Sequence, residues 1–360
     1  MGAALGIYTN NCAKPFLSAV STDVLAPSIR FRRFHLQAVA RMILPHRFRM
    51  KKCYQVPIKN RVEVWSREKG GGSLSGICIC GSLWTCPVCS ARISEHRRKD
   101  LQQGVSGWEG EGGSVMLLTL TFPHVVSDRL LETYPKFGSA MTRFQKHRTF
   151  RQWASDHGLK HRVRASEITH GANGWHPHAH VLLFLDRPVA QEAVSSLFDA
   201  WSAACRLAGL GSPSRANGID LRNGSHAAAY AAKWGLAHEL TKGHSKRGRA
   251  GSRTPFDLLA CHADTGDMLD ARLFREYAQA TFRRPQLQWS YGSRAALGLK
   301  KELTDEEAAK GETTPADVLL ATMTNEQFRL VVRARAQCDL IDLANDGDPF
   351  AVQAFIRSLL

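Results

Sequence analysis

The chain has 360 residues, of which 44% are hydrophobic and 22% charged, so it is too apolar for a disordered protein. Lys and Arg outnumber Asp and Glu by 16, and the isoelectric point is near 9.7. Such an excess favours a polyanionic partner, first of all nucleic acid, because each neutralised phosphate releases counterions. A basic enzyme without a polymeric partner is the alternative.

The charge is unevenly distributed along the chain. Residues 301–360 carry a net charge of −5, and residues 1–300 therefore carry +21. We expect residues 296–360 to form a separate acidic, helical tail. We expect residues 1–67 to be a basic N-terminal extension, either an arm that grasps DNA or a poorly ordered segment.

Membrane and secretory signals are missing from the sequence. No apolar run approaches the roughly 18 residues of a membrane span, and the first residues do not resemble a signal peptide. Nine cysteines, four of them within residues 78–89, suit a reducing compartment with one local metal site. The sequence therefore predicts a cytoplasmic protein that does not contact membranes.

The predicted elements begin with a flexible, glycine-rich linker at residues 68–76 and a cysteine knuckle with a basic helix at 77–103. Strands are expected at residues 115–122, 162–169 and 179–185, the last two joined by the turn sequence Gly171-Ala-Asn-Gly174. Helices are expected at 130–157, 189–207 and 225–240, and an edge strand at 283–290. These elements predict an α+β fold on an antiparallel sheet flanked by helices, in a domain spanning 104–295.

The segment His176-Pro-His-Ala-His180 is the sharpest chemical feature. On a strand, alternation places its three histidines on one face. Two imidazoles and a carboxylate from a neighbouring strand form an open divalent-metal site, and Glu167 lies just across the predicted turn. A chance cluster is the alternative, but three histidines at period two before an apolar strand argue against it.

Tyr230 and Lys233 are three residues apart and share one face of a predicted helix. A phenol is a poor nucleophile at neutral pH because its ordinary pKa is about 10. A metal on the scissile phosphate and a nearby ammonium can offset that deficit of roughly 3 pKa units, about 4 kcal/mol. Alone, the spacing fits an ordinary core tyrosine equally well, and it gains weight by following the histidine strand.

The cysteines Cys78, Cys80, Cys86 and Cys89 predict a zinc-type knuckle. Cys86 and Cys89 have the spacing of a zinc-binding pair, and the fourth ligand is either Cys78 or His96. A redox-active pair and a metal-free buried cluster are the alternatives.

Residues 242–253 form a basic, glycine-containing loop. We expect this loop to contact DNA phosphates beside the active site, and a solvated loop is the alternative. The candidate contacts are Lys242, Lys246, Arg247, Arg249 and Arg253.

These segments together resemble the replication initiators of rolling-circle plasmids, which belong to the HUH endonuclease superfamily. The resemblance rests on Glu167 and on four ordered segments: Cys80-Gly-Ser-Leu-Trp-Thr-Cys-Pro-Val-Cys89, Leu117-Leu-Thr-Leu-Thr-Phe-Pro123, Gly174-Trp-His-Pro-His-Ala-His-Val-Leu182 and Tyr230-Ala-Ala-Lys-Trp-Gly235. It implies an HUH-type sheet, with His178 and His180 as ligands of Mn²⁺ or Mg²⁺ and Glu167 as the third ligand. It also implies that Tyr230 is the nucleophile and Lys233 its companion.

The implied reaction is transesterification at the plasmid origin. Tyr230 would keep the 5′ phosphate and release a 3′-OH for the host polymerase, with a host helicase as a further partner. Trp234 stands where some relatives have a second tyrosine, which argues for a single-tyrosine enzyme. His226 stands where others have a carboxylate for termination, and Glu239 is the candidate substitute.

Several rival functions remain open. An HUH transposase or a conjugative relaxase would share the chemistry. A histidine-triad nucleotide hydrolase fits the histidine motif but leaves the charge, the cysteines and Tyr230 unexplained. A non-catalytic, zinc-containing DNA-binding regulator leaves the histidine strand unexplained.

Overall fold

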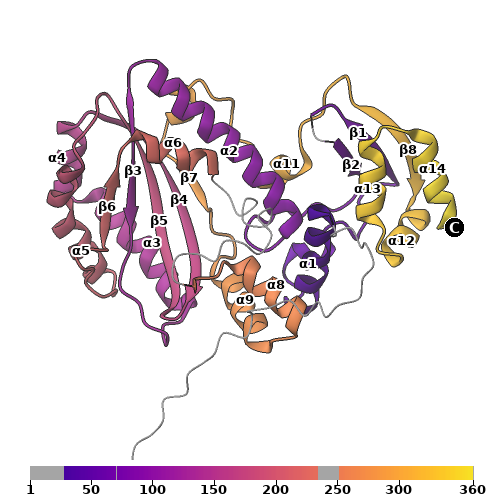
Figure 1. The fold of residues 1–360 in the computed structure, drawn as a ribbon, viewed down its shortest axis with the longest axis horizontal. Coiled ribbons are helices and arrows are strands. Elements are labelled where there is room, and N and C mark those ends of the chain that lie inside the picture. Colours follow the sequence, from indigo (N-terminus) through magenta and orange to yellow (C-terminus); the bar gives the residue numbers. More distant parts are fainter. Residues whose placement is uncertain (1–27, 70, 234–250, 360) are drawn as a thin grey trace, which may run out of the picture.

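The computed structural model describes residues 28–69, 71–233 and 251–359. Its strands are β1 (Arg61–Arg67), β2 (Gly71–Ser75), β3 (Ser114–Leu120), β4 (Leu159–Gly171), β5 (Gly174–Leu185), β6 (Ile219–Arg222), β7 (Leu287–Trp289) and β8 (Val318–Thr324). They form a five-stranded sheet of order β6-β3-β5-β4-β7 and a three-stranded sheet of order β2-β1-β8, with antiparallel pairing in both (Figure 1).

Helices connect and cover the two sheets. Those of the first half of the chain are α1 (Ile29–Ile43), η1 (Arg49–Lys52), α2 (Pro87–Gly110), α3 (Leu130–Lys146), α4 (Arg148–Asp156), η2 (Gln191–Leu197) and α5 (Phe198–Leu207). Those of the second half are α6 (Gly224–Lys233), α8 (Pro255–Thr265), α9 (Met268–Ala280), α10 (Ser293–Ala296), α11 (Asp305–Lys310), α12 (Asn325–Arg333), α13 (Gln337–Asn345) and α14 (Pro349–Ser358). No helix in the described ranges is long and apolar enough to cross a membrane.

The five-stranded sheet contains the strands that the sequence predicts. The apolar run after residue 114 forms β3 between β5 and β6, and residues 283–290 contribute the short edge strand β7. Strands β4 and β5 form a hairpin in which Gly171 pairs with Gly174. Gly174 has a φ of 83°, a left-handed conformation that glycine adopts without steric cost. The α+β prediction with an antiparallel, helix-flanked sheet is confirmed.

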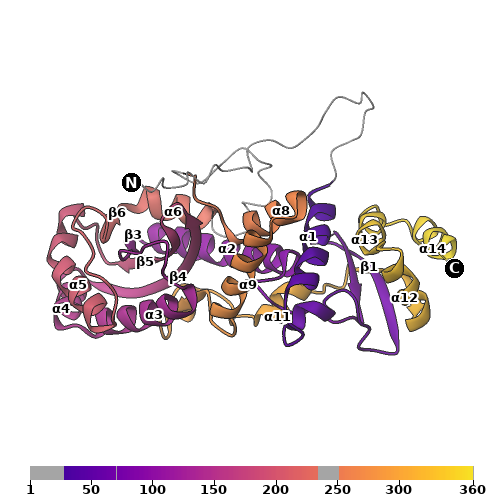
Figure 2. The ribbon, with the colours of Figure 1, turned by 90° about the horizontal axis from the view of Figure 1, so that it is seen from below.

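Both faces of this sheet are buried over much of its extent, which explains the apolar runs Val115–Leu118 of β3 and Val181–Leu185 of β5. On one face Leu118 packs in a core that includes Trp201 of α5, under α3. On the other face Leu117 packs with Leu101 of α2 and Ala227 of α6. Figure 2 shows the sheet between these two helical layers. Helix α6 therefore lies over the face of the sheet that carries the odd-numbered residues of β3.

The three-stranded sheet joins the two ends of the described chain (Figure 1). Val62 and Val64 of β1 pair with Met323 and Ala321 of β8. The Arg67 guanidinium lies 2.7 Å from the Asp317 carboxylate, which is 3% exposed. The acidic C-terminal segment is thus partly strand and is joined to the basic N-terminal half, which differs from the separate helical tail predicted.

The prediction of a flexible linker at residues 68–76 is wrong. Gly71–Ser75 of this segment form β2, which pairs with β1 and packs against α13. A Cβ atom at Gly72 would collide with the backbone carbonyl of Ile341. The glycines of this segment therefore permit close packing of a helix on a strand. A glycine-rich composition alone does not distinguish such a closely packed strand from a flexible linker.

Residues 28–67 belong to the core, which differs from the peripheral extension predicted. Helix α1 buries Leu36, Gln37 and Ala40, and its basic side chains alternate with this apolar stripe. The density of arginines in the sequence obscures that helical period. Residues 1–27 lie outside the described residues.

We predict that Gly72→Ala lowers the free energy of unfolding by about 1–3 kcal/mol, because the added methyl group overpacks the β2–α13 contact. Gly107→Ala on α2 is the control, since nothing lies within 4 Å of its Cβ position. Chemical denaturation followed by circular dichroism measures both changes. Equal stability of the two variants would contradict the proposed close packing.

Candidate functional site

The central hairpin brings the predicted metal ligands together. Glu167 of β4 lies directly opposite His178 of β5 in the strand register. His180 follows two residues later on the same face and lies opposite Thr119 of β3. The three histidines of β5 alternate with buried residues, as predicted from the period of a strand.

The three predicted ligands converge on one point. Oε2 of Glu167 lies 3.3 Å from Nε2 of His178 and 3.8 Å from Nε2 of His180. Their ligand atoms all lie within 4.8 Å of one another, and each of the three residues is partly exposed. Two imidazoles and one carboxylate suit a divalent transition-metal ion and leave coordination positions for substrate and water.

Hydrogen bonds fix the orientation of both imidazoles. Nδ1 of His180 lies 3.0 Å from the Thr119 hydroxyl, and Nδ1 of His178 donates to the His176 carbonyl at 3.3 Å. Because the Nδ1 atoms are engaged, the Nε2 atoms face Glu167. Thr119 could not be predicted from local sequence patterns, since its contact with His180 depends on the pairing of β3 with β5.

The electrostatics of the site keep Glu167 ionised. Burial opposes its ionisation, but the hydrogen bond with His178 and the charges of His178 and His180 hold its pKa at about 2. Burial lowers the pKa of His180 to about 4, so this imidazole is neutral at physiological pH. Burial also acts on His178, but the hydrogen bond and charge of Glu167 prevail and raise its pKa. A cation must therefore compete with a proton on His178.

Tyr230 reaches the same point from helix α6. Its hydroxyl donates a hydrogen bond of 2.8 Å to Oε1 of Glu167, and its ring centroid lies 4.7 Å from that of His180. Helix α6 follows the edge strand β6 directly and packs on α2 and β3. Lys233 is the last residue of α6. The structure thus joins Tyr230 to the predicted ligands, although these lie 50 to 63 positions before it in the sequence.

His176 lies beside the ligand group rather than in it. Its Nδ1 is 2.8 Å from Nε2 of His124, whose Nδ1 lies 2.9 Å from the Asn173 carbonyl oxygen. His124 thereby connects the loop after β3 to the β4–β5 turn. No periodicity in the sequence indicates His124.

A second group of ligands lies among buried cysteines. The Sγ atoms of Cys53, Cys80, Cys86 and Cys89 all lie within 4.8 Å of one another, and all four residues are buried and free of disulfides. Cys53 occupies the fourth position of the cluster, for which Cys78 or His96 was predicted.

Neither predicted fourth ligand joins this cysteine cluster. The backbone of Cys78 hydrogen-bonds to Tyr54 and Val56 and so holds the segment that carries Cys53. His96 lies instead 3.8 Å from Asp100. Spacing within 78–89 could not identify Cys53, because that cysteine lies in a separate segment brought close by backbone pairing.

The basic loop is only partly within the described residues. Lys242, Lys246, Arg247 and Arg249 lie outside the described residues, as do Trp234 and Glu239. Arg253 forms a β-bridge with His170, and its guanidinium lies 2.7 Å from the buried Asp270 carboxylate. This ion pair shows that Arg253 also has a structural contact, and its contact with DNA stays a prediction.

Fold and site together define a class: a basic α+β protein with a candidate cation site and a tyrosine hydroxyl on one face of its central sheet. The model of a family described as replication protein (Rep) matches residues 74–194, which contain Glu167, His178 and His180. "Protein rep" of Streptomyces lividans is 27% identical over 377 residues, which cover 81% of this chain and 81% of the relative. The chain is thus similar to the Rep family of replication proteins, in line with the sequence resemblance.

A "Neomycin resistance protein" of Streptomyces cyanogenus is 27% identical over 148 residues, 34% of each chain. No solved structure matches the chain.

We predict that the protein binds Mn²⁺ and that Glu167→Gln and His180→Ala each weaken this binding at least tenfold, since each removes a ligand. Affinity should also fall as the pH drops below neutral, because the raised pKa of His178 favours its protonated form. Calorimetric titration measures both effects. His176→Ala is the matched control on the same strand, and a loss as large as that of His180→Ala would contradict the ligand assignment.

Proposed function

We propose that this protein is a plasmid replication initiator that nicks one strand of the origin and starts rolling-circle synthesis. The observation that supports the proposal is the convergence of a nucleophile and a cation site: the Tyr230 hydroxyl lies 2.8 Å from the carboxylate that also faces His178 and His180. The net charge of +21 on residues 1–300 supports DNA as the substrate.

In the proposed reaction the Tyr230 oxygen attacks the scissile phosphorus. A bond forms between the phenolic oxygen and phosphorus, and the bond between phosphorus and the 3′ oxygen breaks. The phenolic proton is lost and the 3′ oxygen gains one, so the products are a 5′-phosphotyrosine and a free 3′-OH. The 3′-OH is then the primer for the host polymerase, with a host helicase opening the duplex.

Glu167 positions Tyr230 in this scheme. With a pKa of about 2, the carboxylate is far too weak a base to take the proton of a phenol whose ordinary pKa is about 10. It instead accepts the phenolic hydrogen bond and aims the oxygen. We assign the role of favouring phenolate to Lys233, one helical turn beyond Tyr230.

The donor set fits a resident divalent cation. When bound by Glu167, His178 and His180, such a cation polarises the scissile phosphate and stabilises the charge that develops there. Two imidazoles favour Mn²⁺ over Mg²⁺, which prefers oxygen ligands. A transposase or relaxase would use the same groups, and the replication-protein relatives favour the initiator.

We infer that the cysteine cluster binds zinc. The Sγ atom of Cys53 lies 3.5 Å from that of Cys89 and 3.9 Å from that of Cys86, and the Cys80–Cys89 distance is 3.6 Å. Zinc–sulfur bonds of about 2.3 Å in a tetrahedron require sulfur–sulfur distances of about 3.8 Å, whereas a disulfide needs about 2.05 Å.

The surroundings of the cysteine cluster suit thiolates. The Cys80 backbone N–H donates to Cys53 Sγ at 3.4 Å, and the side-chain amide of the buried Gln37 donates to Cys86 Sγ at 3.1 Å. Burial opposes ionisation of Cys86, but hydrogen bonds from the neighbouring cysteines hold its pKa well below its usual value. The ion would join the segment after α1 to the start of α2, which is a structural role.

The nicking proposal predicts an SDS-resistant adduct between the protein and a single-stranded oligonucleotide carrying the nick site of its plasmid, formed with Mn²⁺. Tyr230→Phe should abolish the adduct because it removes the attacking oxygen, and mass mapping should locate the nucleotide on Tyr230. Tyr291→Phe is the control, since this side chain is fully exposed elsewhere. An undiminished adduct in Tyr230→Phe would exclude Tyr230 as the nucleophile.

The zinc proposal predicts one zinc per purified chain by elemental analysis. Cys53→Ser should lose most of the zinc and lower the melting temperature, whereas Cys78→Ser, the matched control, should keep the ion. If Cys53→Ser retains zinc and Cys78→Ser loses it, the fourth ligand is Cys78, as expected from the spacing, and not Cys53.

A further inference from the structure

A small hollow at the β7 edge of the five-stranded sheet, here called the arginine hollow, contains two cations. Arg162 and Arg164 are two residues apart on β4 and therefore point to the same face. This face is the one turned toward α3, because Arg164 lies opposite Val181, whose side chain packs in the core beneath α3. The residues that line the arginine hollow are Gln145, Arg162, Arg164, Gln288, Trp289 and Ser290.

The two guanidinium groups lack a counter-charge in the described part of the chain. Burial lowers the pKa of Arg162 and of Arg164, and repulsion between the two contributes to the shift at Arg164. No carboxylate of the described residues lies within 4.0 Å of either group. Arg164 donates to the Gln288 side chain, while its buried Nε has no hydrogen-bond partner among the described residues.

Three other partly buried arginines do have carboxylate partners, whereas Arg33, like Arg164, has a buried Nε without a partner among the described residues. Arg67, Arg253 and Arg294 each lie within 2.8 Å of an aspartate. Leaving a partly buried cation unpaired destabilises a fold, so departures from pairing concentrate at functional sites. Arg162 and Arg164 are such a departure.

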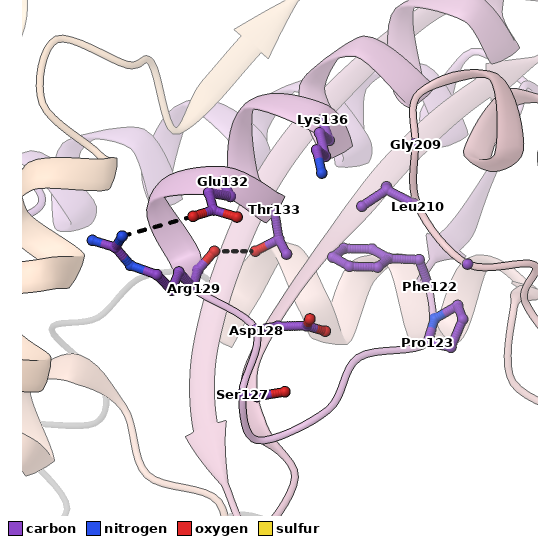
Figure 3. Close-up of a pocket in the computed structure, with 11 residues that line it drawn as sticks. Phe122, Pro123, Ser127, Asp128, Arg129, Glu132, Thr133, Lys136, Gly209 and Leu210 are labelled. Carbon is purple, nitrogen blue, oxygen red and sulfur yellow. Dashed lines mark hydrogen bonds and ion pairs between the residues drawn. The ribbon is translucent and has the colours of Figure 1, made fainter.

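A second hollow shows the contrasting arrangement (Figure 3). It lies beside the start of α3 and contains Arg129 and Lys136 together with Asp128 and Glu132. The Arg129 guanidinium lies 3.7 Å from the Glu132 carboxylate. Charges of both signs are present there, so that hollow does not require an anion.

We propose that the arginine hollow binds a phosphate group of the DNA backbone. Two guanidinium groups, the amides of Gln145 and Gln288 and the Ser290 hydroxyl offer the several donors that a phosphate accepts, and arginine matches phosphate geometry well. Glu167 lies on the opposite face, so DNA held here passes around the β7 edge while another part of the strand reaches Tyr230. The inference rests on the proposed function only in taking DNA as the ligand.

The test compares two double variants in the Tyr230→Phe background, where no covalent adduct forms. Arg162→Gln with Arg164→Gln removes two charges from the arginine hollow, and Arg129→Gln with Lys136→Gln removes two from the hollow of Figure 3. Affinity for duplex DNA is measured at several salt concentrations. We expect the Arg162/Arg164 substitutions to weaken DNA binding about tenfold. They should also reduce the salt slope, which is the slope of log affinity against log salt concentration, by about 1, the value for one lost phosphate contact. The second pair should leave the slope unchanged.

A stability measurement separates binding from folding. Without phosphate, the Arg162/Arg164 variant should melt at the same temperature as its parent or higher, because it loses unpaired buried charge. Inorganic phosphate should raise the melting temperature of the parent and not that of the variant.

Three results would overturn the proposal. A variant that melts lower and keeps the parental salt slope would make the arginines structural. Equal effects of the two pairs would show that only net charge matters. If inorganic phosphate raises the melting temperature of the parent but the Arg162/Arg164 substitutions leave the salt slope of DNA binding unchanged, the arginine hollow binds a small phosphate compound and not DNA. None of these results depends on nicking, so a failure of the Tyr230 proposal can be distinguished from a failure of the arginine-hollow proposal.

Discussion

The register of the β4–β5 hairpin is the constraint on which the site depends. It places Glu167 opposite His178, so that a carboxylate and two imidazoles share one face. A slip of one residue would move the glutamate to the opposite face, because side chains alternate with period two. The two-residue turn closed by Gly171 and Gly174 holds this register, and the buried residues between the histidines reinforce it. Binding chemistry and hydrophobic burial are thereby set by the same pairing.

Helix α6 adds the second half of the site. It lies over the sheet because Ala227 packs with the apolar residues of α2 and β3, and that packing brings the Tyr230 hydroxyl to Glu167. Alanine at this position allows the helix to approach the sheet closely. The Tyr230 hydroxyl is thus positioned by a small buried side chain on its own helix.

Much of this arrangement follows from local sequence patterns. Alternation in β5 and the glycines of the turn predict the hairpin, the shared face of the histidines and Glu167 as their partner. The contacts that local patterns cannot predict are long-range: Thr119 against His180, His124 against His176, and Cys53 in the cysteine cluster. Each depends on which segments pair in three dimensions, and periodicity within one segment carries no information about that.

The three-stranded sheet has a consequence for the order in which the chain folds. Strand β1 pairs with β8, and about 250 residues separate the two in sequence. During synthesis β1 has no such neighbour until almost the whole polypeptide has emerged, since domains fold as their strands become available. The large sheet, built from β3 to β7, does not wait for β8. A nascent or prematurely terminated chain can therefore assemble the sheet that carries the Glu167 site while still exposing the unpaired edge of β1, a template for association with other chains.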